Sequence, residues 1–132
     1  MRIGEVATRA GVNIDTVRFY ERRGILPKPQ REPSSGYRTY SVDTPRRIRF
    51  IKRAQELGFT LKEVRELLSL RARPGARCAD VLVRADAKIQ DVNAKIRTLQ
   101  AIRRALSKLA SECAGRGEIT ACPILDALED EE

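Results

Sequence analysis

Residues 3–26 read IGEVATRAGVNIDTVRFYERRGIL, and this stretch predicts two short helices joined by a tight turn. Apolar residues recur at helical spacing over residues 3–10, and Gly11 follows where a helix would end and the chain turn. Asn13 can cap a second helix, and Gly24 lies beyond the end of that helix. Such a helix-turn-helix is either a general packing unit or a DNA-reading one.

The uneven distribution of charge along the chain favours the DNA-reading alternative. Residues 1–58 carry 13 Lys and Arg against 6 Asp and Glu, whereas residues 59–132 carry 13 against 12. A basic segment around a helix-turn-helix is typical of proteins that bind a polyanion. The alternative is a generally basic surface that serves solubility alone.

A small wing is expected after the two helices. The segment 27–35 contains three prolines and leads into SGYRTYS at residues 35–41, where Tyr37, Thr39 and Tyr40 suit a short strand. We therefore expect a two-stranded hairpin at about residues 31–40.

Two more helices follow the wing. Asp43 or Thr44 can cap the first of them. Thr60 and Glu63 fit a capping box for the second, which should run through Leu70. The residues expected on the buried faces of these helices are Ile48, Ile51, Ala54, Leu57, Val64, Leu67 and Leu68.

The longest periodic run in the chain begins after a break at residues 71–77, RARPGAR. Apolar residues or cysteines alternate at steps of four and three, with one three-residue step repeated near Ile102. This apolar seam consists of Cys78, Leu82, Ala85, Ile89, Val92, Ile96, Leu99, Ile102, Leu106, Leu109 and Cys113. A helix over residues 78–113 is roughly 54 Å long, and a domain of this size cannot cover its seam. The simplest partner is the same helix of a second copy.

Length and composition exclude several classes of protein. The chain has 132 residues, which suffice for one compact domain and an extension. Only 5% of the residues are aromatic and none is Trp or His, so we expect no enzyme, because neither a large aromatic pocket nor a catalytic base constellation can be built. No stretch approaches a membrane span, and the N-terminus lacks the apolar core of a signal peptide, which predicts a cytoplasmic protein.

The three cysteines are the candidate chemical site. Their odd number argues against a disulfide framework and leaves free thiols, metal ligation or redox chemistry. Cys78 and Cys113 lie about 52 Å apart along one straight helix, so they cannot share a ligand within one chain. In a parallel homodimer each would face its own counterpart, whereas an antiparallel pairing centred near Lys95 and Ile96 brings Cys78 beside Cys113 of the other copy. Cys122 can return to the same place because glycines allow the intervening loop to turn.

Three thiolates without imidazole select soft metal ions. A closed zinc site needs four ligands, so zinc would have to recruit water or a carboxylate such as Asp80, Glu112 or Glu118. A soft divalent ion that accepts three sulfurs fits better. The alternative is that the cysteines are small buried apolar residues.

The N-terminal half resembles the MerR family of bacterial transcription regulators. The resemblance rests on VRFYERRG at residues 17–24, the GYR of the wing at 36–38, and ELGFTLKE at 56–63. It implies a mainly α-helical fold: residues 1–70 form a winged helix-turn-helix domain with the motif at about 3–22, residues 71–77 a linker, and residues 78–113 an antiparallel coiled-coil dimerisation helix. Residues 114–132 would form a metal-binding loop and a short C-terminal helix.

The same resemblance implies a mechanism and partners. Regulators of this kind bind double-stranded promoter DNA as homodimers, together with RNA polymerase. They repress when empty, and distort the DNA when metal binds so that the promoter elements realign. The candidate DNA-contacting residues carried over are Thr16, Arg18, Tyr20, Tyr37, Arg38, Arg47 and Lys52. Phe19 is expected in the core, and Tyr20 and Tyr40 can equally be packing residues.

The C-terminal half is similar to the mercury-sensing branch of the family, on the cysteine spacing and on the sequence CAGRGEITACPIL at residues 113–125. The resemblance implies that Cys78, Cys113 and Cys122 bind Hg(II) as effector, with Pb(II), Cd(II) or Zn(II) as alternatives. Two rival hypotheses remain from other classes. One is a redox sensor in which Cys113 and Cys122 form a disulfide, and the other is a soft-metal carrier whose DNA affinity is incidental.

Overall fold

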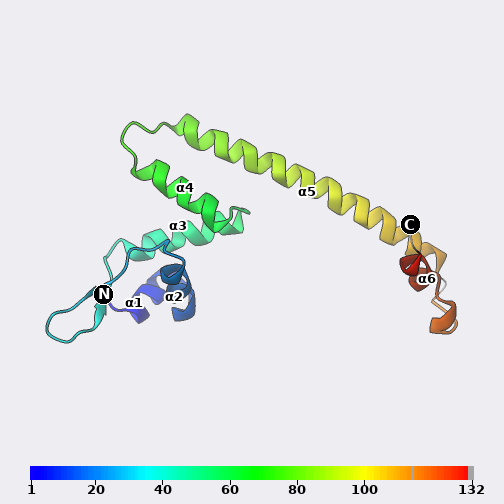
Figure 1. Ribbon diagram of the computed structural model, residues 1–132, viewed down its shortest axis with the longest axis horizontal. Coiled ribbons are helices and arrows are strands. Elements are labelled where there is room, and N and C mark those ends of the chain that lie inside the picture. The colour runs from blue at the N-terminus through cyan, green and yellow to red at the C-terminus, as the bar shows by residue number, and fades with distance from the viewer. Residues whose placement is uncertain (114, 131–132) are drawn as a thin grey trace. The chain divides into compact units, whose positions relative to one another are not determined.

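The computed structural model describes residues 1–113 and 115–130 (Figure 1). Ala114, Glu131 and Glu132, which belong to the predicted segment 114–132, lie outside the described residues. The chain is mainly helical, as expected, and divides into two compact units, Met1–Val83 and Arg84–Glu132. The elements are α1 (Ile3–Ala10), α2 (Ile14–Arg22), β1 (Gln30–Arg31), β2 (Arg38–Thr39), α3 (Thr44–Glu56), α4 (Leu61–Ala72), α5 (Cys78–Glu112), the short 3₁₀ helix η1 (Ile119–Ala121) and α6 (Pro123–Glu129).

Helices α1 and α2 form the predicted helix-turn-helix, and α3 packs against α1 (Figure 1). Gly11 ends α1 in a left-handed conformation, with φ of 71°, which glycine adopts without strain. The side chain of Asn13 accepts a hydrogen bond from the backbone N–H of Thr16 at 2.8 Å and so caps α2. Val6 and Val17 are fully buried in the shared core. Both turn signals in the sequence are therefore confirmed.

The wing is a two-residue antiparallel strand pair. Gln30 lies opposite Thr39 and Arg31 opposite Arg38. A further hydrogen bond from the backbone N–H of Glu32 to the carbonyl of Tyr37, at 2.7 Å, continues the hairpin beyond the strands. The hairpin expected at about residues 31–40 is confirmed.

Helix α3 buries most of its predicted apolar face. Ile48 and Ile51 are fully buried, but Leu57 is 70% exposed, so its assignment to the core is wrong. Leu57 is the C-terminal cap of α3, where the chain leaves the helical path, and it therefore drops out of the periodic face. Asp43 occupies the N-terminal cap position, one of the two expected for it, but makes no side-chain capping hydrogen bond, and proline lies in the first turn.

Helix α4 begins with the predicted capping box. The Thr60 hydroxyl accepts from the backbone N–H of Glu63 at 3.2 Å, and the Glu63 carboxylate accepts from the backbone N–H of Thr60 at 2.8 Å. Val64 is fully buried, whereas Leu67 and Leu68 are only half-buried. The helix continues two residues past the predicted end at Leu70, to Ala72.

Helix α5 runs without interruption from Cys78 to Glu112, one residue short of the predicted end. Its apolar seam is exposed in the single chain: Val92 is 40%, Ile96 46% and Leu99 63% exposed. None of the helices among the described residues is long and apolar enough to cross a membrane.

The segment after α5 turns as the glycines predict. Gly115 and Gly117 have φ values of 71° and 96°, in the left-handed region. Cys122 occupies the N-terminal cap position of α6, and Pro123 lies in the first turn of that helix, where its missing N–H is no loss.

Candidate DNA interface and candidate metal centre

The exposed side of α2 is the first part of the candidate DNA interface. Arg18 projects from it into solvent, free to reach a base edge or a phosphate. Thr16 is half-buried, and its hydroxyl donates to the side chain of Asn13 at 2.8 Å, so it also serves the helix cap. Phe19 is 41% exposed, which corrects its assignment to the core. It lies on the outer side of α2 because the buried side is occupied by its neighbours Val17 and Tyr20.

Tyr20 is a core residue in this structure. It is 4% exposed, and its hydroxyl donates a hydrogen bond to the side-chain oxygen of Gln55 at 2.8 Å. Burial and the nearby Glu56 carboxylate raise the pKa of this hydroxyl. Of the two functions weighed for Tyr20, packing and phosphate contact, its burial favours packing.

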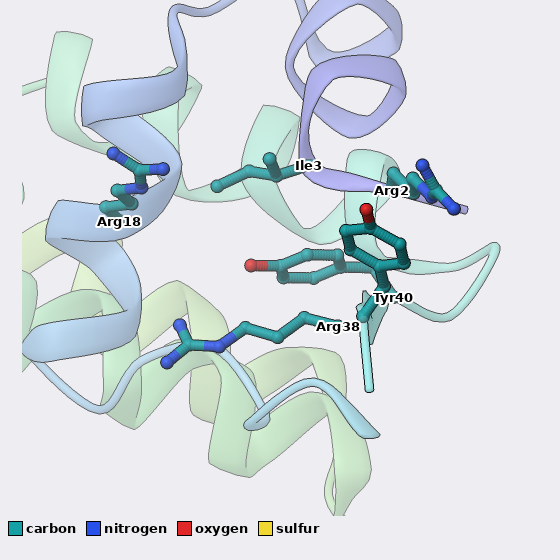
Figure 2. A pocket seen from close by; sticks show the side chains of 6 residues that line it. Arg2, Ile3, Arg18, Arg38 and Tyr40 are labelled. Carbon is teal, nitrogen blue, oxygen red and sulfur yellow. The ribbon is translucent and has the colours of Figure 1, made fainter. Parts of the chain in front are cut away.

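A basic hollow lies between α2 and the wing (Figure 2). It encloses about 470 Å³, and its lining consists of Arg2, Ile3, Arg18, Tyr37, Arg38 and Tyr40. Figure 2 shows Arg18 on its helix at one side of the hollow and Arg2 at the other, with Arg38 reaching from the wing. Three guanidinium groups around one hollow suit phosphate oxygens, which arginine binds through its forked donors.

The hollow unites three of the predicted DNA-binding residues, Arg18, Tyr37 and Arg38, and adds Arg2, which the sequence analysis missed. The Arg2 guanidinium lies 4.1 Å from the centre of the Tyr37 ring, a cation–π contact across the face of an exposed aromatic. The only signal for Arg2 in the sequence is its positive charge in the basic half, because its contact to Tyr37 spans a large sequence separation.

Tyr40 and Glu21 connect the wing to α2. The Tyr40 hydroxyl donates a hydrogen bond to the Glu21 carboxylate, and Arg38 Nη1 lies 3.8 Å from the other Glu21 oxygen. Burial, and then the hydrogen bond to Glu21, raise the pKa of Tyr40 to about 12, so its hydroxyl stays protonated at neutral pH. Glu21 is the second functional candidate that sequence reasoning missed.

Two basic residues of α3 donate hydrogen bonds to backbone carbonyls in or just after the helix-turn-helix. Arg47 Nε donates to the carbonyl of Ile25 at 3.2 Å, and Lys52 Nζ to the carbonyl of Gly11 at 3.4 Å. Arg47 is half-buried and Lys52 is exposed. Their expected phosphate contacts stay predictions.

The three cysteines are free thiols at the ends of two helices. Cys78 is the first residue of α5 and is exposed, Cys113 directly follows α5, and Cys122 directly precedes α6; the last two are partly exposed. Within residues 1–113 and 115–130 of one chain, no three His, Cys, Asp or Glu side chains gather as metal ligands. The cysteine site, with one thiol expected from a second chain, therefore stays a prediction.

The donor chemistry fits a soft metal. The chain has free thiols and no imidazole. A site made of its strongest soft-metal ligands would therefore contain sulfur atoms alone. Such a site would bind a thiophilic ion as thiolates and release protons on binding.

Two family models match the chain. The model described as MerR HTH family regulatory protein matches residues 1–70, and the model described as MerR, DNA binding matches residues 46–109. The chain belongs to the MerR family. It is thus a member of a family of DNA-binding transcription regulators and not an enzyme, as the sequence indicated.

Known MerR-family proteins are similar over nearly the whole chain. The mercuric resistance operon regulatory protein of Bacillus cereus is 46% identical over 127 residues, 96% of each chain. The regulator PbrR691 from Ralstonia metallidurans CH34, solved in complex with lead(II), is 39% identical with a TM-score of 0.85 and covers 97% of this chain and 98% of its own. The dual-function regulator MerR from Bacillus megaterium MB1, solved with mercury(II), is 42% identical with a TM-score of 0.73, covering 98% and 100%.

Proposed function

We propose that this MerR-family chain is a mercury(II)-responsive transcription regulator. It represses a resistance promoter when metal-free and activates that promoter by DNA distortion when Hg(II) is bound. The observation that carries the proposal is the cysteine pattern, with one thiol opening α5, one directly after it and one before α6, in a chain without histidine. The similarity to the mercuric resistance regulator of Bacillus cereus over 96% of both chains supports it.

Residues 1–70 form the DNA-binding domain in this proposal. The basic hollow binds the phosphate backbone, with Arg18 on α2 and Tyr37 and Arg38 on the wing as its main contacts. Arg47 and Lys52 contribute less, because both also donate to backbone carbonyls. A regulator that binds promoter DNA acts where the DNA is, so the cytoplasm is part of the proposal.

The proposed function also requires that two copies of the chain form a homodimer. The exposed apolar seam of α5 is supporting evidence, since a stripe of this length in water favours a partner helix. We infer that residues 78–113 of two copies pair in antiparallel fashion, residues 71–77 serving as linker. Two DNA-binding domains would then contact the two halves of one palindromic operator.

The metal site would hold Cys78 of one copy with Cys113, at the end of the segment 78–113, and Cys122, in the segment 114–132, of the other. A bound soft cation supplies a cross-link of three metal–sulfur bonds between the copies. Because the ligands come from two chains, the affinity of the site depends on how these chains are arranged. Metal binding then shifts the equilibrium between a repressing and an activating conformation.

Activation would follow from a change in the DNA. A dimer that favours underwound, bent DNA brings two promoter elements into better register for RNA polymerase, and specificity then comes partly from the deformability of the operator. The polymerase is therefore the second macromolecular partner.

Lead or cadmium is the alternative effector. The fold similarity to the lead(II) complex of PbrR691, with a TM-score of 0.85, favours keeping lead as an alternative. Coordination by three sulfurs is chemically reasonable for both ions. Zinc is less favoured, since a closed zinc site requires a fourth ligand. The redox alternative, with a disulfide between Cys113 and Cys122, predicts a response to peroxide in the absence of metal.

The decisive experiment is transcription in vitro from the native promoter, with mercury, lead, cadmium and zinc titrated separately under reducing conditions. We expect activation by mercury at a concentration at least about tenfold below that of the other ions. Activation first by lead or cadmium would reassign the metal, and indifference to every ion would refute metal response.

Cys78→Ser separates the metal site from the redox alternative. The variant should bind the operator like the wild type and lose the mercury response, because one of three sulfurs is missing. Asp86→Asn, an exposed position about two turns further along α5 and outside the apolar seam, is the control and should respond normally. Activation of Cys78→Ser by peroxide would favour the redox sensor.

A further inference from the structure

The Glu21 carboxylate is nearly enclosed, although it belongs to a basic surface. Its side chain is 11% exposed, while that of the neighbouring Arg38 is 57% exposed. A carboxylate removed from water requires hydrogen bonds or a cation to offset its lost hydration. The described structure gives it both, the Tyr40 hydroxyl and the Arg38 guanidinium.

Glu21 does not line the basic hollow, but both of its partners do. Arg38 comes from β2, whereas Glu21 lies in the last turn of α2, the helix that also carries Arg18. The carboxylate thus connects the arginine of the wing to the helix that carries the arginine on the other side of the hollow.

Electrostatics alone would argue against an acid at this place. A negative charge beside a phosphate-binding surface weakens the attraction to DNA. A positioning function resolves the conflict. A carboxylate that holds Arg38 in place fixes the distance between the Arg38 and Arg18 guanidinium groups before DNA binds.

We propose that Glu21 is a positioning residue that fixes Arg38 of the wing relative to α2, so that the DNA-binding domain discriminates its operator from other DNA. This inference rests on the proposed function, and specifically on DNA binding through the basic hollow. The wing has other attachments, since Tyr40 donates its backbone N–H to the carbonyl of Met1 at 2.7 Å and Arg2 contacts Tyr37. Loss of the Glu21 charge should therefore leave the wing folded.

Glu21→Gln tests the proposal in the full-length protein. Glutamine keeps an acceptor oxygen for the Tyr40 hydroxyl but presents an amide group, itself a donor, in place of the carboxylate oxygen near Arg38. The probes are a duplex selected from a random-sequence pool by the wild-type protein and a scrambled duplex of the same composition. Affinity for each is measured over a series of salt concentrations, together with the melting temperature.

Positioning and simple charge removal predict different preferences for the selected duplex over the scrambled one. Removal of a negative charge alone should leave this preference at the wild-type value. If Glu21 positions Arg38, the variant binds the scrambled duplex as well as or better than the wild type, while its preference for the selected duplex falls by roughly three- to tenfold. Glu5→Gln is the matched control, because Glu5 pairs with Arg9 at 2.9 Å on α1 and neither residue lines the hollow. Its preference should equal that of the wild type.

A double-mutant cycle with Arg38→Ala shows whether Glu21 acts through Arg38. In the Arg38→Ala background, Glu21→Gln should cause no further loss of preference, whereas a merely structural carboxylate would cause the same loss in both backgrounds. If Glu21→Gln does not fold, Glu21→Asp replaces it, since the shorter side chain withdraws the charge from Arg38, and a smaller loss of preference is expected.

Each outcome either supports or overturns the positioning function of Glu21. A wild-type preference in the folded Glu21 variant, or an equal loss in both backgrounds, overturns the positioning function while DNA binding stands. A wild-type protein that selects no duplex from the pool removes DNA recognition itself, and the positioning function with it.

Discussion

The N-terminal unit and helix α5 differ in where their apolar side chains find partners. In the unit Met1–Val83, side chains from α1, α2, α3 and α4 meet in one core, and Val6, Ile48 and Val64 have no exposed surface. Along α5, in contrast, seam residues such as Ile96 and Leu99 are about half exposed or more.

The contrast shows which properties one chain can encode alone. The DNA-binding fold is complete within a single copy, because its core is closed by its own helices. In the proposed dimer a second copy completes the seam and the cysteine site, so metal response and dimer formation should fail together while the DNA-binding fold survives.

The largest effect should come from a charge in the seam. Ile96→Glu places a carboxylate at the centre of the proposed antiparallel pair, where an uncompensated buried charge costs on the order of 3–5 kcal/mol. Analytical ultracentrifugation should find monomer at concentrations where the wild type is dimeric. The control is Ala94→Glu, which adds the same charge away from the seam and should leave the dimer intact. Equal behaviour of the two variants would contradict the proposed dimer.

The converse experiment removes core volume from the N-terminal unit. Ile51→Ala should lower the free energy of unfolding by about 2–5 kcal/mol, because Ile51 is fully buried. Leu57→Ala should change it by about 0.5 kcal/mol or less, because Leu57 is 70% exposed. Urea denaturation followed by circular dichroism measures both. A large loss of unfolding free energy in Leu57→Ala would contradict its exposed position and support the core position that its spacing in the sequence predicted.

A smaller effect is expected at the start of α4. Thr60→Ala removes one half of the capping box and should cost about 1 kcal/mol. Asp43→Ala should cost about 0.5 kcal/mol or less, since Asp43 makes no capping hydrogen bond. Thermal unfolding of the two variants side by side distinguishes the cap that forms from the one that does not.

The last effect concerns pH and is expressed only in alkaline solution. The pKa of Tyr40 is about 12 in the folded chain against 10.0 ordinarily, so its contribution to stability is fully present below pH 10 and is lost as pH rises toward about 12. Tyr40→Phe removes this contribution. The difference in unfolding free energy between wild type and variant should therefore shrink between about pH 10 and about pH 12. A constant difference over that range would contradict the raised pKa.

Local signals made most of the N-terminal unit predictable from the sequence. Gly11, Asn13 and the pair Thr60–Glu63 each determine a turn or a cap through atoms a few residues apart. Leu57 and Phe19 were misassigned because periodicity does not show where a helix ends or which of two adjacent aromatics faces the core.

The candidate DNA site was only partly predictable, for a different reason. Arg18, Tyr37 and Arg38 are marked by charge and by their motif, but Arg2 and Glu21 act through contacts between residues distant in sequence. No local pattern indicates that the Tyr40 hydroxyl reaches Glu21. The cysteine site was predictable as chemistry, from three thiols without histidine, but its assembly depends on a second chain.

Heterodimers test most directly whether two chains share each metal site. In a heterodimer with Cys78→Ser on one chain and Cys113→Ser on the other, one shared site keeps all three thiols, and we expect one tightly bound Hg(II) in the presence of competing thiol. With both substitutions on one chain and a wild-type partner, both shared sites lose a ligand, and we expect none. The opposite pattern, none in the first heterodimer and one in the second, would mean that each chain binds its metal alone and would contradict the shared site.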